Sequence, residues 1–182
     1  MSKALVPLAE GCEELEAITI TNLFVRAGID VTTVGLDYLP VNTARGTRII
    51  PDKNINDVLE NTYDLIVLPG GLPGANHLRD DPRVQNLLKK HAADNKYIAA
   101  ICAAPKALAS AGLLDNRTAT AYPGVLAALN LTSTTIKESA IEIDGKIITS
   151  RGPGTAMDFA LTLIEILEGK EKREEVNKQL VR

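Results

Sequence analysis

Short runs of apolar residues alternate along the chain with longer segments in which apolar residues recur every three or four positions. The apolar runs predict strands at residues 4–8, 31–35, 65–68, 97–101, 119–122 and 147–150. Several of these runs show no alternation of apolar and polar residues, which is typical of strands covered by helices on both faces. The pattern therefore favours a mostly parallel sheet inside the molecule.

The segments of helical spacing fall between the strands. They predict helices over residues 14–27, 82–93, 105–111 and 155–167, followed by a charged surface helix over residues 170–180. Gly169 comes just before this last helix and is expected to end the preceding one as a C-cap. The pair Asp144-Gly145, between residues 139–143 and 146–149, predicts a tight antiparallel hairpin.

Together these elements predict one α/β domain over residues 1–182, a doubly wound, mostly parallel sheet sandwiched by helices, with a small antiparallel hairpin. Ligands of such sheets bind beyond the carboxyl ends of the strands. The segments that follow the strands are residues 9–16, 69–74, 102–105, 122–124 and 151–155. We expect the functional side chains in these segments.

Composition and charge exclude some classes of function. The 182 residues include 20 basic and 23 acidic side chains, for a formal charge of −3, and only 3% are aromatic. A nucleic-acid binder would need a basic surface or aromatic stacking platforms, so no nucleic-acid partner is expected. The N-terminal apolar stretch is too short for a signal-peptide core, and no apolar run approaches the roughly 20 residues of a membrane span. These features predict a cytoplasmic protein without a membrane partner.

Cysteine and histidine are scarce, with two of each. Two cysteines make no disulfide framework, and His77 and His91 lie outside any His-Glu-x-x-His motif, so neither a metal nor a cofactor is expected. Thiols stay reduced in the cytoplasm, where a single cysteine can be reactive. The remaining question is whether one of these four side chains carries the chemistry.

Cys102 stands where a reactive thiol would be placed. The apolar run at residues 97–101 stops at Cys102, which is followed by Ala103, Ala104 and Pro105. Proline favours the first turn of a helix, so we expect Cys102 at a sharp strand-to-helix turn that resembles a nucleophile elbow. A helix N-terminus also favours the thiolate form. The alternative is a buried structural cysteine that packs as a small apolar side chain, and position alone leaves both open.

The acidic segment after the first strand contains a candidate partner for this thiol. Stepping back at helical spacing from Leu23 through Ile20 leads to Glu16, which continues an apolar stripe toward the core. Burial would raise the pKa of its carboxyl group and suit it to acid–base work. Glu13 and Glu14 are interpreted instead as charges that complement the helix dipole.

Other features allow two interpretations. Gly70 and Gly71 follow a strand, and their N–H groups suit a developing oxyanion, although a tight turn explains the same pair. Arg151 either neutralises an anion or joins an interface. Cys12 is interpreted as loop filler, with a resolving thiol for an oxidised Cys102 as the alternative.

Four motifs in order make the sequence resemble a known family. They are Gly-Cys-Glu-Glu-Leu-Glu at residues 11–16, Leu-Pro-Gly-Gly at 68–71, Ala-Ile-Cys-Ala-Ala-Pro at 100–105 and Ser-Arg-Gly-Pro-Gly-Thr at 150–155. Together they span essentially the whole chain and resemble the ThiJ/PfpI superfamily. Within it the chain is most similar to the clade of the parkinsonism-associated DJ-one protein and its bacterial chaperone and deglycase relatives.

The resemblance implies a flavodoxin-like fold, a homodimer, and a site centred on Cys102 as the nucleophile. It implies that the Glu16 carboxyl group is hydrogen-bonded to the Cys102 sulfur, and that Gly70 and Gly71 supply backbone donors. The other residues that it suggests are Ala103 and Tyr122 for substrate binding, and Arg26, Arg45 and Pro153 as pocket or dimer contacts. The two arginines match positions that, in relatives, lie near the cysteine pocket across the dimer.

The activity that the resemblance implies is a cysteine-dependent deglycase and glutathione-independent glyoxalase. Its substrates would be methylglyoxal, glyoxal and their early adducts on proteins and nucleotides, with chaperone action under oxidative stress in addition. Ala103 stands where the protease-like branches have a histidine, and Tyr122 stands where some closer members have one, although a phenol is a poor base at neutral pH. The alternatives are a non-enzymatic redox sensor or holdase that uses Cys102 oxidation and, ranked last, an intracellular cysteine peptidase.

Overall fold

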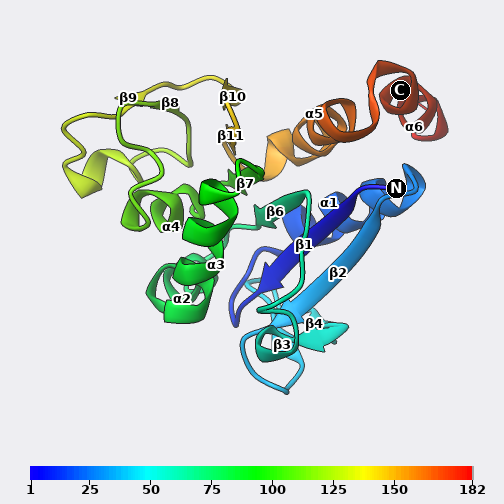
Figure 1. Ribbon diagram of the computed structural model, residues 1–182, viewed down its shortest axis with the longest axis horizontal. Helices are drawn as coiled ribbons and strands as arrows, with labels where there is room; N and C mark the ends of the chain where they lie inside the picture. The colour runs from blue at the N-terminus through cyan, green and yellow to red at the C-terminus, as the bar shows by residue number, and fades with distance from the viewer. Residues whose placement is uncertain (182) are drawn as a thin grey trace.

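The computed structural model describes residues 1–181, and a seven-stranded sheet of order β10-β11-β7-β6-β1-β2-β5 runs through its centre (Figure 1). The strands are β1 (Lys3–Leu8), β2 (Asp30–Gly35), β5 (Lys53–Asn54), β6 (Leu65–Leu68), β7 (Tyr97–Ile101), β10 (Ile141–Asp144) and β11 (Ile147–Ser150). Neighbouring strands run parallel except β10 and β11, which form an antiparallel hairpin. The predicted mostly parallel sheet with a hairpin is confirmed, and β5 is an edge strand that the sequence pattern did not indicate.

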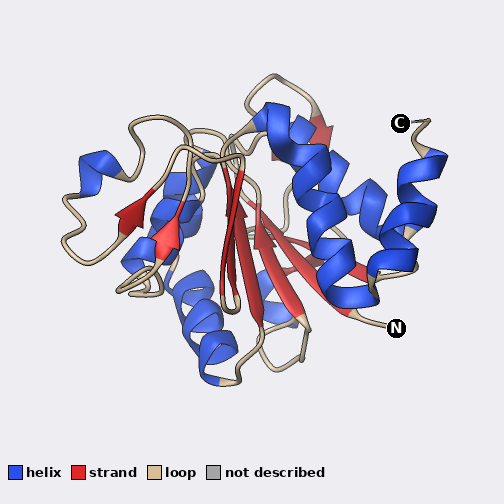
Figure 2. Ribbon diagram, turned by 90° about the horizontal axis from the view of Figure 1, so that it is seen from above, coloured by secondary structure: helices blue, strands red, loops and turns tan. Residues whose placement is uncertain are grey.

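Helices lie on both sides of this sheet, and Figure 2 shows the strands between them. They are α1 (Glu14–Arg26), α2 (Gly74–Asp80), α3 (Pro82–Ala93), α4 (Pro105–Ser110), α5 (Ala156–Glu168) and α6 (Lys170–Gln179). Gly169 ends α5 at a φ of 90°, which confirms the predicted C-cap. The sequence pattern did not predict α2, because this short helix buries only Gly74, Ala75 and Leu78. Within residues 1–181, no helix combines the length and the apolar character that crossing a membrane requires.

Each face of the sheet carries its own apolar core, because successive side chains of a strand point to opposite faces. On β1, Val6 packs in the core that includes Phe24 of α1 and Phe159 of α5. Its neighbour Leu5 packs in the other core, with Leu88 of α3 and side chains of α4. Since both faces are covered, the strands need no polar side, which explains the missing alternation in the sequence.

Two small sheets lie outside the central one. They are the antiparallel pair β3 (Val41–Asn42) and β4 (Arg48–Ile49), and the parallel pair β8 (Thr118–Ala119) and β9 (Thr135–Ile136). The predicted strand over residues 119–122 is confirmed only at Ala119, which belongs to the small β8–β9 pair and not to the central sheet. The Thr120 N–H donates to the side chain of Thr149 at 2.9 Å, and the Tyr122 N–H donates to the Cys102 carbonyl at 2.8 Å. These contacts draw the segment toward the end of β7 instead of into a strand ladder.

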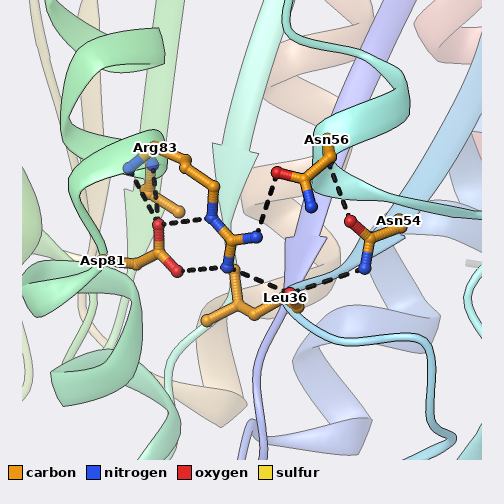
Figure 3. Close-up of polar contacts among 6 residues, drawn as sticks. Leu36, Asn54, Asn56, Asp81 and Arg83 are labelled. Atoms are coloured by element: carbon orange, nitrogen blue, oxygen red, sulfur yellow. Dashed lines mark hydrogen bonds and ion pairs between the residues drawn. The ribbon is translucent and has the colours of Figure 1, made fainter.

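One arginine forms hydrogen bonds with the segments next to the edge strand β5. Arg83, in the first turn of α3, donates to the Leu36 carbonyl at 3.0 Å and to the Asn56 side chain at 3.1 Å (Figure 3). Its guanidinium group also pairs with Asp81, the residue that caps α3, at 2.6 Å. The Asn54 side chain accepts from the Asn56 N–H at 2.9 Å and thereby joins the edge strand to the same network. Together these contacts tie the chain after β2 to α3.

Candidate active site

A cavity of about 310 Å³ lies beyond the carboxyl ends of the central strands. Its lining residues are Glu13, Ala44, Arg45, Gly71, Leu72, Cys102, Ala103, Tyr122, Val125 and Pro153. Each of the five segments that the sequence predicted to hold the site contributes at least one of them. A second hollow of similar size, about 360 Å³ between residues 37–40 and 50–57, is lined by no cysteine or histidine. The cavity at Cys102 is therefore the candidate active site.

The backbone presents Cys102 at a sharp turn between β7 and the residues that lead into α4. Its φ is 63°, in the left-handed region that costs a residue with a side chain about 1–2 kcal/mol. The Cys102 N–H donates to the Ser150 carbonyl at 3.0 Å, and its own carbonyl accepts from the Tyr122 N–H at 2.8 Å. Contacts on both sides thus hold the strained conformation, and the predicted elbow is confirmed as a backbone feature. The Cys102 residue is 8% exposed, so its side chain reaches the cavity from a largely buried position.

Glu16 lies beneath this cysteine and is fully buried, as its place on the apolar stripe of α1 predicted. Its Oε2 atom accepts a hydrogen bond of 2.8 Å from the Gly70 N–H. Its Oε1 atom has no hydrogen-bond partner that meets standard geometry among residues 1–181. The thiol of Cys102 interacts with the same carboxyl group. The Glu16 carboxyl group is consequently placed to exchange a proton with the sulfur.

Gly70 separates the two side chains, and only glycine fits there. A Cβ atom on Gly70 would lie 2.6 Å from the Cys102 Cβ and 2.9 Å from the Glu16 Oε2. These distances are shorter than van der Waals contacts, so any side chain would push the pair apart. The resemblance had suggested the Gly70 N–H as a donor to the substrate, but this N–H is bound to Glu16 and Gly70 does not line the cavity. Its role in the structure is to fix the carboxyl group.

Burial shifts the pKa of both groups upward. Burial raises the pKa of Glu16 to about 7. For Cys102, burial and the negative charge of Glu16 together raise the pKa to about 12. The backbone N–H groups of Gly71 and Ala103 act in the opposite direction and lower the pKa of the thiol. The expectation that a helix N-terminus would lower this pKa overall was wrong, because α4 begins only at Pro105 and burial outweighs it. Two buried anions in contact repel each other, so the pair keeps one shared proton above a pH of about 7.

The remaining residues suggested by the resemblance divide into two groups. Tyr122, Pro153 and Arg45 line the cavity. Arg45 does so within its own chain, with its Nε 3.9 Å from the Glu13 Oε2. Arg26, at the end of α1, is bonded to Asn22 at 2.8 Å and does not line the cavity.

Four lining residues were not predicted, namely Glu13, Ala44, Leu72 and Val125. Glu13 and Leu72 belong to segments in which the sequence predicted functional residues. Glu13 was interpreted as a charge that complements the helix dipole, so its position on the cavity wall was not predicted. Ala44 follows β3, and its N–H donates to the Cys12 carbonyl at 2.8 Å. This contact between two loops that lie far apart in the chain has no signature in either segment.

Cys12 and the histidines lie outside the cavity lining. Cys12 is fully buried, and burial raises its pKa to about 12. His77 is bound through Nδ1 to the Glu10 carbonyl at 3.0 Å, whereas His91 is buried on α3 with its pKa lowered by burial. Within residues 1–181, no three histidine, cysteine or acidic side chains gather in a way that could hold a metal ion. The titratable side chain that interacts with the Cys102 thiol is therefore Glu16, and neither histidine.

The chain is similar in sequence and in fold to known proteins. It is 43% identical to "Protein DJ-1 homolog A" of Arabidopsis thaliana over 97% of its own length, although it spans only 46% of that longer relative. It is also 43% identical to "Protein dj-1beta" of Drosophila melanogaster, with 100% of this chain and 98% of that one aligned. The crystal structure of Drosophila DJ-1beta superposes with a TM-score of 0.95 at 42% identity, covering 100% of this chain and 98% of the other.

A further relative, "Glutathione-independent glyoxalase DJR-1.2" of Caenorhabditis elegans, is 37% identical over 94% of this chain and 91% of its own. A family model described as DJ-1/PfpI matches residues 2–166. This match extends over most of the chain and includes Glu16, Gly70 and Cys102. The chain therefore belongs to the DJ-1/PfpI family.

Proposed function

We propose that the protein is a glutathione-independent glyoxalase and deglycase that uses Cys102 as its nucleophile. The observation that carries the proposal is the buried pair of Cys102 and Glu16, which shares one proton beside a cavity that opens to solvent. Membership of a family that contains a relative named as a glutathione-independent glyoxalase supports it. The substrates would be methylglyoxal, glyoxal and their early adducts on proteins or nucleotides.

The first step is addition of the sulfur to the aldehyde carbon. The shared proton moves to the Glu16 carboxylate, and the Cys102 thiolate attacks the carbonyl carbon and forms a hemithioacetal oxyanion. The N–H groups of Gly71 and Ala103, which already face the sulfur, stabilise the developing negative charge. Glu16 then gives its proton to the oxyanion and becomes a carboxylate.

The second step moves a hydrogen between two carbon atoms. The Glu16 carboxylate removes the proton from the former aldehyde carbon, and an enediolate forms that is still bound to sulfur. Glu16 returns this proton to the neighbouring carbon, and the hydroxyl proton passes from the oxygen of the former aldehyde carbon to the oxygen of the former ketone carbon. The product is a hydroxyacyl thioester, so the aldehyde carbon is oxidised and the ketone carbon is reduced within one molecule. Water then cleaves the thioester, which releases lactate from methylglyoxal and restores the thiol. The route uses side chains of this protein, water and the substrate alone.

An assay of the purified protein tests this proposal. Methylglyoxal is supplied without glutathione, and lactate is followed by proton NMR, with Cys102→Ala as the matched variant. We expect lactate from the wild type and none above background from Cys102→Ala, whose circular dichroism should be unchanged. Equal lactate from both proteins would exclude the covalent route.

A second candidate function is a redox sensor or holdase that responds through Cys102. The unpartnered Oε1 of Glu16 favours it, because a protonated carboxyl group there could donate to the oxygen of a cysteine sulfinate. Mild peroxide followed by mass spectrometry of Cys102, together with an assay for suppression of aggregation, separates the two functions. Suppression that depends on oxidation, with no lactate formed, would favour the sensor.

We also propose that the protein acts as a homodimer in the cytoplasm. The apolar side chains of Leu15, Ile18 and Val25 on α1 are 49–65% exposed, and their spacing places them along one side of the helix. A second copy would remove this surface from water. Light scattering coupled to gel filtration measures the mass directly, and Ile18→Glu should shift a dimer toward the monomer.

A further inference from the structure

Glu13 is a carboxylate on the cavity wall that accepts no hydrogen bond from any of residues 1–181. The residue is only 9% exposed and lines the same cavity as Cys102. Its one ion pair, with Arg45, joins Nε and Oε2 at 3.9 Å, which is too long for a hydrogen bond. No donor to its side chain occurs among residues 1–181. A carboxylate accepts up to about four hydrogen bonds, so Glu13 offers this capacity to a ligand in the cavity.

The charge of Glu13 contrasts with the rest of the cavity wall. Its side chains are mostly apolar, namely those of Ala44, Leu72, Ala103, Val125 and Pro153. The side chain of Arg45 is 80% exposed and lies mainly in water, whereas that of Glu13 is 11% exposed. Charges interact more strongly in a poorly hydrated site than at the surface. A bound molecule therefore meets a buried negative charge at Glu13, while the positive charge of Arg45 on the same wall lies mainly in water.

We propose that Glu13 is a specificity-determining residue that binds the guanidinium or ammonium group of a cationic adduct. The inference rests on the proposed function and names its preferred substrates as methylglyoxal adducts of arginine and lysine side chains, ahead of the neutral adducts of thiols. Free methylglyoxal has only five heavy atoms and leaves most of a 310 Å³ cavity unfilled. A guanidinium group presents paired N–H donors that match the two oxygens of a carboxylate.

The geometry gives the two ends of such an adduct different partners. The carbon atoms derived from the dicarbonyl meet Cys102 and Glu16, while the nitrogen atoms meet Glu13 on the wall. Hydrolysis consumes one water, breaks the carbon–nitrogen bond of the adduct and releases lactate together with the free guanidine or amine. Glu13 acts on neither the bond nor the proton, and its effect is confined to which adduct is held.

The test measures binding apart from turnover, through protection of Cys102 from alkylation by iodoacetamide. The probes are butylguanidinium and its neutral isostere butylurea. We expect butylguanidinium to protect wild-type Cys102 at about tenfold lower concentration than butylurea, a difference of about 1.4 kcal/mol, because only the guanidinium group makes a charge-assisted hydrogen bond. Glu13→Gln should abolish this difference, and Glu13→Asp should restore part of it.

The matched control is Glu14→Gln, which removes the same charge one residue away but outside the cavity lining. It should preserve the preference for butylguanidinium. Equal protection by the two probes in the wild type, or an unchanged preference in a folded Glu13→Gln, would overturn the inference. Because alkylation needs no turnover, a protein that makes no lactate but prefers butylguanidinium would contradict the proposed function alone.

Discussion

Cys12 and Cys102 are both buried thiols, and burial raises the pKa of each to about 12, yet their surroundings differ. Cys102 borders a cavity at a left-handed turn and contacts a buried acid, Glu16. Cys12 is fully buried and its backbone packs closely against Gly74 of α2. A raised pKa therefore does not separate a reactive thiol from a structural one. The separation comes from an opening to solvent and from an acid that can take the proton.

The largest effect should come from removing each sulfur in turn. Cys102→Ala should lower lactate formation by about 10⁴-fold or more, because the covalent route loses its nucleophile. Cys12→Ala should keep the activity and lose only about 1 kcal/mol of stability, since a small buried atom is removed. Lactate assays and thermal melts of both variants check this pair. A loss of activity in a folded Cys12→Ala would break the comparison.

Removing the acid from the Cys102 region should have the next largest effect. Glu16→Gln should lower the turnover of methylglyoxal by about 10²–10⁴-fold, the range of general acid–base catalysis. The negative charge of Glu16 raises the pKa of Cys102, so the same variant should move the alkylation of this thiol to lower pH. Rates of iodoacetamide labelling as a function of pH measure the shift. An identical labelling curve would show that the two groups are not coupled.

Two glycines, one next to each cysteine, allow Cys102 and Cys12 to be compared by changing the neighbouring backbone. Gly70→Ala would place a Cβ 2.6 Å from the Cys102 Cβ, and Gly74→Ala would place one 2.6 Å from the Cys12 backbone nitrogen. We expect Gly70→Ala to reduce activity by about 10²-fold, because displacing reacting groups by about 1 Å has that effect. Gly74→Ala should lower the melting temperature with a smaller change in the kcat of molecules that remain folded. The reverse pattern would place the functional site at Cys12.

The sequence could predict much, though not all, of the difference between the surroundings of Cys102 and Cys12. Apolar runs that end at Cys102 and an apolar stripe that passes through Glu16 are local patterns, so the elbow and the buried acid followed from them. The direction of the Gly70 N–H is not local, because it depends on where α1 packs relative to β6. The pKa of the thiol was likewise misjudged, since helix position can be read from a sequence but the depth of burial cannot.

The hydrophobic pattern also did not predict the loop that carries Arg45, because long-range contacts place this loop. The strands β3 and β4 have two residues each and show no periodicity, and they are placed by contacts such as the bond from the Ala44 N–H to the Cys12 carbonyl. Only the resemblance to a family indicated Arg45, and it did so as a pocket or dimer contact. In the structure the residue lines the cavity of its own chain. Long-range contacts between irregular segments leave no pattern in one sequence.

The smallest expected effect is on stability as a function of pH. Burial raises the pKa of Glu16 in the folded protein from an ordinary value of 4.5 to about 7. The folded state thus holds this proton more tightly than the unfolded state, so the contribution is fully present below pH 4.5 and is lost as the pH rises through 7. Glu16→Gln should flatten this part of the stability curve, as measured by urea unfolding between pH 4.5 and 8. A curve that keeps its slope in the variant would assign the dependence to another group.

The central claim is that Cys102 reacts covalently and Cys12 does not. Purified protein is mixed with methylglyoxal, quenched in acid during turnover, and digested for mass spectrometry. We expect an adduct with the mass of one methylglyoxal on the peptide that contains Cys102 and none on the peptide that contains Cys12, with the adduct decaying as lactate accumulates. Lactate formation with no adduct on Cys102, or an adduct on Cys12 that decays at the rate of turnover, would contradict the account.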